Sequence, residues 1–235
     1  CFCTAEELAS KRQSNYDKGI QGYDRACRDI DPDVAKARIA AGDAHVWRLK
    51  VPLDHGPITF HDAINGECSF PNDVMDDFIL MRSDGTPTYN FTTVVDDAAM
   101  KISHVIRGND HLSNTPRQIL VYEALGAPVP EFAHLSMING PDGKKLSKRH
   151  GATSVEEFKE AGYFPDALIN CLALLGWSLD GETTIFDRKT LCAHFSLDRI
   201  NKSPATFDIE RLNWINQQYI KSMGAPAFVD ALVPY

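Results

Sequence analysis

The chain shows three successive patterns of apolar and polar positions. Between 44 and 70 apolar and polar residues alternate, which is typical of half-buried strands. From 78 to 138, short apolar runs of strand length lie on either side of a helical segment. Beyond 154 the apolar residues recur at helical spacing. The order strand, helix, strand in the middle part predicts an α/β fold with a parallel sheet.

Local start and stop signals place the expected elements. Asp31 and Pro32 open a helix that Gly42 ends, and Ser154 with Glu157 forms a capping box. Besides the helix that starts at this box, helices are expected at about 4–16, 32–41, 113–125, 165–175, 188–194 and 209–222. Strands are expected at 44–51, 58–62, 67–70, 78–82, 103–108 and 132–138.

The sequence also predicts one hairpin turn and several residues of the buried core. Asn65 and Gly66 predict a tight hairpin turn between two strands. Residues 88–97 alternate and then become apolar. The helix over 209–222 has a core face formed by Leu212, Ile215 and Tyr219. Large aromatic side chains are mostly buried, so a core position is also expected for Trp47, Phe60, Trp177 and Trp214.

Composition and charge limit the classes of function. The 235 residues suffice for one large or two small domains. Since the net charge is −8, any contact with nucleic acid must use a local basic patch on an acidic body. No apolar run has the length of a membrane span, and charged sequence rather than a signal peptide follows Cys3. Six cysteines do not suggest a secreted disulfide framework here, so we expect a cytoplasmic protein without membrane contact.

A basic segment punctuated by glycine occupies residues 140–151. A Pro-Asp-Gly turn opens it, and it carries four permanent cations: Lys144, Lys145, Lys148 and Arg149. The apolar run 132–138 leads into the segment, and a capped helix follows it. A strand that enters a cationic, glycine-rich turn places ammonium groups where a polyphosphate can lie. The alternative interpretation is a solvated surface loop.

The basic segment resembles a known signature. Residues 145–149, Lys-Leu-Ser-Lys-Arg, are similar to the Lys-Met-Ser-Lys-Ser motif of class I aminoacyl-tRNA synthetases, in the form found in bacterial glutamyl-tRNA synthetases. Residues 85–97 and 105–112 resemble the second half of that family's catalytic domain. The resemblance implies an α/β fold: the second half of a Rossmann-type parallel sheet, with an α+β insertion for the tRNA acceptor end before it and a helical stem-contact region after it. The three parts would occupy 1–77, 78–139 and 140–235.

The resemblance also implies roles for single residues. Tyr89 and Arg107 would hold glutamate, and the planar fork of an arginine suits a carboxylate. Without the resemblance, Arg107 would be assigned to an ion pair with Asp96 or Asp97. The ATP site implied by the family comprises Asp110, His111, Met137, Ile138, Lys145 and Lys148. The two lysines of this set would hold the phosphates and carry the catalysis.

Three cysteines near the start of the chain are candidate zinc ligands. Thiolates bind zinc well, and a small module gains folding energy by closing on a metal ion. Cys1 and Cys3, followed by a Tyr-Asp-x-x-Cys-Arg stretch around Cys27, resemble bacterial glutamyl-tRNA synthetases, some of which bind zinc there. The resemblance implies Asp29 as the fourth ligand, with Tyr23 as the alternative. The other interpretation is three free cysteines that remain after the metal was lost.

The implied reaction has two steps. The carboxylate of L-glutamate attacks the α-phosphate of ATP, which binds with Mg²⁺, and the resulting glutamyl-adenylate then passes its glutamyl group to tRNA(Glu). Positioning and charge neutralisation do most of the work in such chemistry. The enzyme is expected to be a monomer. Two alternatives are a non-catalytic tRNA-binding module and a glutamyl-queuosine tRNA(Asp) synthetase; the Leu146 form of the signature disfavours a glutaminyl-tRNA synthetase.

The first signature of the family, His-Ile-Gly-His, has no counterpart among the 235 residues. In the family this signature binds the ATP phosphates. We therefore predict that the isolated chain does not form glutamyl-adenylate. Glutamate-dependent exchange of labelled pyrophosphate into ATP measures this step, with an intact bacterial glutamyl-tRNA synthetase as the positive control. Exchange above background by the isolated chain would show the prediction to be wrong.

Overall fold

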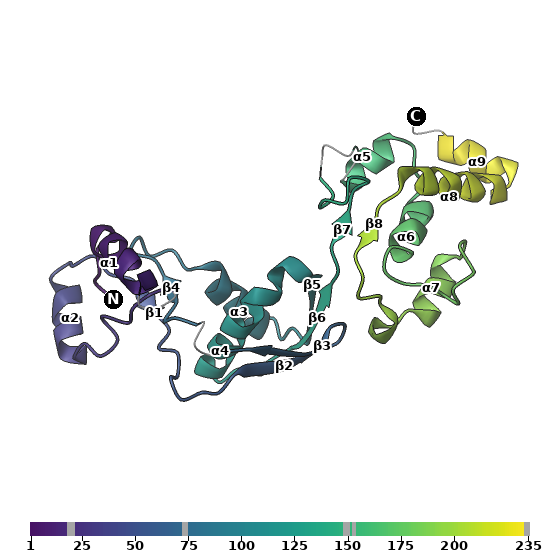
Figure 1. The fold of residues 1–235 in the computed structure, drawn as a ribbon. Coiled ribbons are helices and arrows are strands. Elements are labelled where there is room, and N and C mark those ends of the chain that lie inside the picture. Colours follow the sequence, from purple (N-terminus) through teal and green to yellow (C-terminus); the bar gives the residue numbers. More distant parts are fainter. Residues whose placement is uncertain (18–21, 72–74, 148–150, 152–153, 233–235) are drawn as a thin grey trace. The chain divides into compact units, whose positions relative to one another are not determined.

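The computed structural model describes residues 1–17, 22–71, 75–147, 151 and 154–232 (Figure 1). The chain forms two compact units, which are described separately. Unit 1 comprises Cys1–Asp62, Gly66–Val105 and His111–Phe132. Unit 2 comprises Ala63–Asn65, Ile106–Asp110 and Ala133–Tyr235. Within the described residues, no helix has both the length and the apolar composition that crossing a lipid bilayer requires.

A four-stranded sheet confirms the expected α/β class. Its strand order is β3-β2-β6-β5, with β2 at Ile58–Asp62, β3 at Gly66–Phe70, β5 at His104–Gly108 and β6 at Glu131–Leu135. Strands β2 and β6 are parallel, whereas β2 and β3 form an antiparallel hairpin. Asp62 pairs with Gly66, so the predicted turn is present but spans residues 63–65. Gly66 has a φ of 83°, a backbone conformation that glycine adopts without strain.

Helices α3 (Tyr89–Ala99) and α4 (Thr115–Leu125) pack against the buried core of unit 1. The predicted helix 113–125 is thereby confirmed, and it ends at Gly126 in the left-handed conformation. The core includes Val94, Leu120 and Phe132. Two more helices, α1 (Ala5–Asp17) and α2 (Pro32–Ala40), lie where the sequence predicts them, and the Asp31 carboxylate caps α2.

Three predictions for unit 1 need correction. The alternation over 88–97 is typical of a strand, yet 89–97 lie in helix α3, because Phe91, Val94 and Ala98 at helical spacing face the core. The predicted strand 44–51 shrinks to β1 (Trp47–Arg48). The predicted strand 78–82 becomes β4 (Ile79–Met81), which pairs with β1 and does not join the four-stranded sheet.

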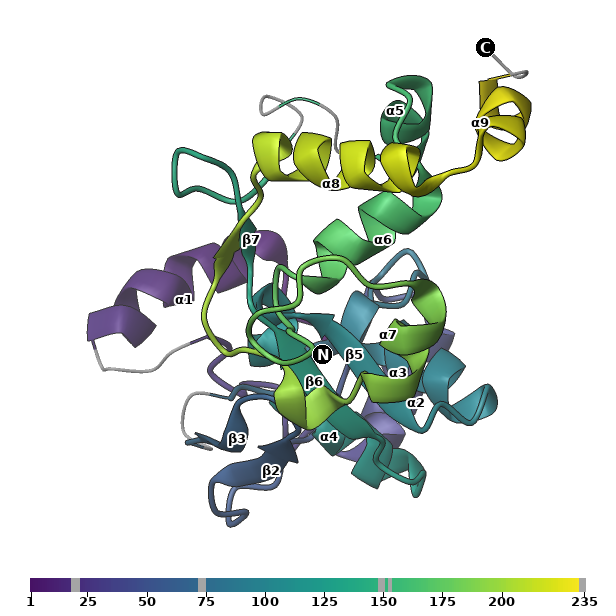
Figure 2. The same cartoon turned by 90° about the vertical axis from the view of Figure 1, so that its right-hand side faces the viewer.

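Unit 2 is mainly helical. Its helices are α5 (Val155–Glu160), α6 (Pro165–Ala173), α7 (Arg188–His194), α8 (Ile209–Ser222) and α9 (Ala225–Leu232). Helix α8 lies across α6 (Figures 1 and 2), and both contribute to one buried core that includes Leu168, Leu212 and Ile215. The predicted capping box at Ser154 and Glu157 is confirmed. So are the bounds predicted for α7 and α8.

The predicted strand 132–138 is interrupted. It splits into β6 and a two-residue strand β7 (Ile138–Asn139), which pairs in parallel with β8 (Ala205–Thr206). Strand β8 was not predicted. Ile138 therefore belongs to a small two-stranded sheet and not to the larger one.

The tryptophan predictions are confirmed only in part. Trp177 is buried and Phe60 packs against the core of unit 1. Trp47 and Trp214 are 54% and 48% exposed, so their assignment to the core is wrong. Trp214 follows Leu212 by two helix positions and therefore points away from the buried face of α8. Trp47 lies in the short strand β1, where its ring contacts His45 edge-on.

Asn170 in α6 connects three segments of unit 2 and is only 1% exposed. Its amide nitrogen donates to the Thr184 carbonyl at 2.8 Å, and its oxygen accepts from the Phe186 amide at 3.1 Å. The Tyr219 hydroxyl lies 3.1 Å from the same oxygen and donates to the Phe186 carbonyl at 2.7 Å. This network joins α6 to α8 and to the segment before α7.

We predict that Asn170→Ala lowers the free energy of unfolding by about 3 kcal/mol, because each buried polar group left unpaired costs roughly 1–3 kcal/mol. Tyr219→Phe is the matched control. It removes one hydroxyl, keeps the ring packing, and should cost only about 1 kcal/mol. Urea titration followed by circular dichroism measures both values. Equal losses in the two variants would contradict the central role of the Asn170 amide.

Candidate functional site

Residues 138–147 form a small hairpin, which we call the signature hairpin. The Leu146 amide donates to the Ile138 carbonyl at 2.9 Å, and the Gly140 amide donates to the Lys144 carbonyl at 2.8 Å. Gly143 has a φ of 72°, which a residue with a side chain adopts only with strain. The Pro-Asp-Gly turn expected from the sequence is therefore present, and it presents Lys145 directly after the tip.

Lys145 contacts the 3-10 helix Asn109–Asn114, which directly follows strand β5. Its ammonium nitrogen lies 2.8 Å from Oδ2 of Asp110, in an ion pair whose side chains are 65% and 44% exposed. An exposed pair of this kind contributes at most about 1 kcal/mol to stability, so its importance lies in where it holds the ammonium group. A Cβ atom on Gly108 would stand 2.5 Å from Oδ1 of Asp110. Glycine at this position thus allows the carboxylate to fold back against the strand end.

Arg107 lies in β5, just before Gly108. Its Nε donates to Nε2 of His134 in β6 at 3.0 Å, and His134 is 1% exposed. The side-chain amide of Asn65 donates to the His134 carbonyl at 3.1 Å. Both contacts lie within unit 2, as does the pair of Asp110 and Lys145. Arg107 thus lies near the carboxyl end of β5, and the Asp110–Lys145 pair follows directly after that end. Parallel sheets bind their ligands at the carboxyl ends of their strands.

The remaining predicted site residues belong partly to unit 1 and partly to unit 2. Tyr89, at the start of α3, is 49% exposed, and its hydroxyl lies 3.4 Å from Nδ1 of His111. Both belong to unit 1, whereas Arg107 belongs to unit 2. Met137 lies between β6 and β7. Lys148, predicted to bind phosphate, lies outside the described residues.

The three cysteines of the predicted zinc site lie together in unit 1. Their sulfur atoms all lie within 4.8 Å of one another, and those of Cys3 and Cys27 are 3.5 Å apart. The hydroxyl of Tyr23 lies 3.2 Å from the sulfur of Cys1 and 4.0 Å from that of Cys3. Asp29 is instead paired with Lys50 at 3.1 Å, and its side chain is 85% exposed.

The cluster changes the acidity of its members. Burial raises the pKa of the Cys3 thiol, and its hydrogen bond with Cys27 raises it further. Burial would also raise the pKa of Cys27, but hydrogen bonds from the Phe2 amide, the Tyr23 hydroxyl and the Cys3 thiol lower it overall. Burial raises the pKa of the Tyr23 phenol. Thiolate, the form that binds metals, therefore develops more readily on Cys27 than on Cys3.

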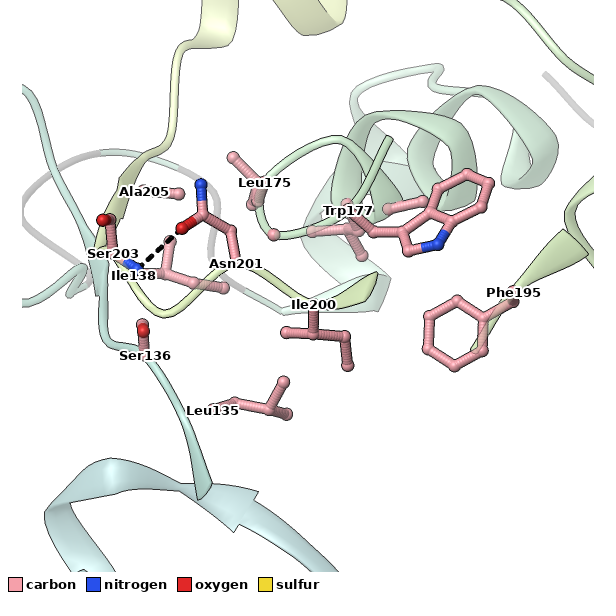
Figure 3. A pocket seen from close by; sticks show the side chains of 13 residues that line it. Leu135, Ser136, Ile138, Leu175, Trp177, Phe195, Ile200, Asn201, Ser203 and Ala205 are labelled. Carbon is pink, nitrogen blue, oxygen red and sulfur yellow. Dashed lines mark hydrogen bonds between the residues drawn. The ribbon is translucent and has the colours of Figure 1, made fainter. Parts of the chain in front are cut away.

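An apolar cavity of about 200 Å³ adjoins the signature hairpin within unit 2. Figure 3 shows Ile138 and Ile200 at this cavity, with Trp177 and Phe195 at one end of it. The indole nitrogen of Trp177 is buried and has no hydrogen-bond partner among the residues that the structure describes. Ile138 thus contributes its side chain to the cavity wall and its backbone carbonyl to the signature hairpin.

A family model described as tRNA synthetases class I (E and Q), catalytic domain, matches residues 1–214. The chain belongs to this family. Its curated relatives include the glutamate–tRNA ligase of Carboxydothermus hydrogenoformans, which is 50% identical over 236 residues. Glutamate–tRNA ligase 1 of Caldanaerobacter subterraneus subsp. tengcongensis is 49% identical over 237 residues. Both matches cover 100% of this chain but only 49% of the relative, so the chain spans about half the length of these relatives.

A solved structure agrees with this assignment. The crystal structure of a glutamate tRNA ligase from Elizabethkingia meningosepticum, in complex with its amino acid, superimposes with a TM-score of 0.84. It is 36% identical in sequence, and the match covers 97% of this chain and 50% of that one. The α/β fold inferred from the sequence motifs is therefore that of the class I synthetase catalytic domain.

Two residues of this candidate site were not predicted from the sequence. His134 was treated only as part of an apolar strand, and Asn65 only as a turn residue, although both are hydrogen-bonded around Arg107. A signal for His134 exists: it is the one strongly polar side chain in the run from Phe132 to Leu135. Asn65 carries no comparable signal, because turns favour asparagine for local reasons.

Proposed function

We propose that the chain is part of a glutamate–tRNA ligase, which joins L-glutamate to tRNA(Glu) through glutamyl-adenylate. The observation that carries the proposal is the ion pair of Lys145 with Asp110, which holds a signature lysine against the segment directly after β5, the strand that contains Arg107. In this proposal Lys145 would bind phosphate and Arg107 would bind a carboxylate, both near the carboxyl end of β5. As such an enzyme, the protein would act in the cytoplasm.

Lys145 would stabilise the phosphates of ATP. When the glutamate carboxylate attacks the α-phosphate, negative charge develops on the departing pyrophosphate, and a positioned ammonium group stabilises that charge. Asp110 holds this ammonium group before ATP binds, and a triphosphate carries more negative charge than one carboxylate. ATP would therefore draw Lys145 from Asp110. Lys148 would assist as the second signature lysine, and Mg²⁺ bound with ATP would neutralise further phosphate charge.

Arg107 and Tyr89 would hold glutamate. Two parallel hydrogen bonds from a guanidinium to a carboxylate give both affinity and orientation. The Tyr89 hydroxyl, which is exposed beside His111, offers an additional polar contact. His111, Met137 and Ile138 would surround the adenine, with the last two acting through their backbones.

The proposal can be tested with a chimera, in which this chain replaces the aligned segment of the Carboxydothermus hydrogenoformans ligase. We predict that the chimera charges tRNA(Glu) with labelled glutamate. Lys145→Ala should slow charging by about 10²–10³-fold, the typical loss when one group that stabilises developing charge is removed. Lys144→Ala is the matched control, since it removes the same charge one residue away and should change the rate less than about threefold.

Two outcomes would point elsewhere. A chimera that binds tRNA(Glu) but never charges it would favour a non-catalytic RNA-binding module. Charging of tRNA(Asp) in place of tRNA(Glu) would favour the glutamyl-queuosine enzyme. Equal losses in the Lys144 and Lys145 variants would remove the specific role of Lys145.

We also propose that the cysteine cluster binds Zn²⁺ through Cys1, Cys3, Cys27 and Tyr23. Tetrahedral coordination with Zn–S bonds of about 2.3 Å separates ligand sulfurs by about 3.7 Å. The distance of 3.5 Å between Cys3 and Cys27 fits this requirement. The Tyr23 hydroxyl lies close to two of the thiols, whereas Asp29 is turned to Lys50. The ion would fix the start of the chain to residues 23–27.

Competition with a chromophoric chelator measures the affinity for Zn²⁺. We predict that Tyr23→Phe weakens binding by about tenfold or more, because an oxygen ligand is lost while the ring that Arg48 covers remains. Asp29→Ala should change the affinity less than about twofold. Cys27→Ser should abolish tight binding. A larger loss of Zn²⁺ affinity in Asp29→Ala than in Tyr23→Phe would instead indicate Asp29 as the fourth ligand.

A further inference from the structure

His134 is an unusual residue for its position. It follows Phe132 and Ala133 in β6, which are 3% and 2% exposed, and is itself only 1% exposed. A buried imidazole is stable when its ring nitrogens are hydrogen-bonded. The bond from Nε of Arg107, at 3.0 Å, supplies such a partner. The polar residue in this apolar strand is thus explained by an arginine on the neighbouring strand.

Because Arg107 is the donor of this hydrogen bond, the protonation state and tautomer of the His134 imidazole are determined. The guanidinium of arginine stays protonated in proteins and can only donate hydrogen bonds. Nε2 of His134 must therefore be the acceptor, which requires a neutral ring with its proton on Nδ1. A protonated ring would have no acceptor and would place two cations in contact in a buried position.

The backbone around His134 is also held in place. Asn65 donates to the His134 carbonyl at 3.1 Å, and Lys202 donates to the Asn65 carbonyl at 3.4 Å. The Asn65 amide also lies 3.5 Å from the side-chain oxygen of Asn109, two residues after Arg107. Through these hydrogen bonds of Asn65, the turn at 63–65 connects β6 to the segment that follows β5. Because the His134 backbone is held by Asn65, the imidazole that contacts Arg107 has a fixed position.

The hydrogen bond to His134 restricts the orientation of the Arg107 guanidinium. With Nε committed to His134, the plane of the group and the direction of its two terminal nitrogens are set. A carboxylate accepts two parallel hydrogen bonds only when it lies in that plane. A guanidinium held in one orientation binds such a ligand more tightly than one that must first be ordered, because the entropic cost of ordering was met during folding.

We propose that His134 is a positioning residue, whose neutral imidazole holds Arg107 in the orientation that receives the carboxylate of glutamate. This inference rests on the proposed function for the role of Arg107 in glutamate binding. The contact between His134 and Arg107 can be tested independently of it.

Nuclear magnetic resonance on the isotope-labelled chain tests the contact. We predict that Nε2 of His134 has the chemical shift of an unprotonated acceptor and that the Nε proton of Arg107 exchanges slowly with water. His134→Phe, which has no acceptor, should accelerate this exchange about tenfold or more, while His134→Gln, which retains one, should preserve most of the protection. The control is His104→Gln in β5, since His104 is exposed and faces Glu131.

Steady-state kinetics on the chimera described above test the consequence for glutamate. His134→Phe should raise the KM for glutamate about tenfold or more and leave the KM for ATP within about twofold, whereas His134→Gln should keep both near the parent values. A general loss of folding would affect both substrates. A protonated Nε2, or rapid exchange of the Arg107 proton in the parent chain, overturns the positioning role. An inactive parent chimera would count against the proposed function and leave the resonance result to decide on His134.

Discussion

A buried polar group that lacks a hydrogen-bond partner destabilises the fold, and several buried polar side chains of this chain are paired with segments that are distant in sequence. Asp77 is 2% exposed and accepts from the guanidinium of Arg28 at 2.5 Å. His134 accepts from Arg107, and Asn170 connects α6 to α8. Each pairing fixes one element against another more specifically than apolar contact does, because hydrogen bonds demand direction as well as proximity. Among the proposed binding groups, Arg107 takes part directly in one of these pairs.

Local chemistry made much of the fold predictable. The carboxylates of Asp187 and Asp208 accept from backbone amides in the first turns of α7 and α8, and the bounds of these helices follow from the sequence alone. Tertiary contacts decided the remaining cases. Residues 88–97 have two competing periodicities, and burial of Val94 selects the helical one. Trp214 is exposed because the orientation of α8 is set by its other face.

The site was predictable as a set of residue types and much less as a set of contacts. Motif resemblance identified Lys145 and Arg107, but no spacing rule states that a lysine will meet a carboxylate 35 positions earlier. The same limit applies to His134, whose role depends on the pairing of two strands. Around the cysteines, sequence left Tyr23 and Asp29 as alternatives. Distances favour Tyr23, because the fold buries its ring beside the thiols and leaves Asp29 at the surface.

Because the tryptophans are distributed unequally, the two units differ in their tryptophan fluorescence. Of the three in the sequence, only Trp47 belongs to unit 1, and it is largely open to solvent. Trp177 and Trp214 belong to unit 2, one enclosed and the other exposed. Indole emission shifts to longer wavelengths in water, so the blue part of the spectrum originates mainly from Trp177. Loss of that blue component on denaturation therefore reports the opening of unit 2, and a Trp47-free variant would emit from unit 2 alone.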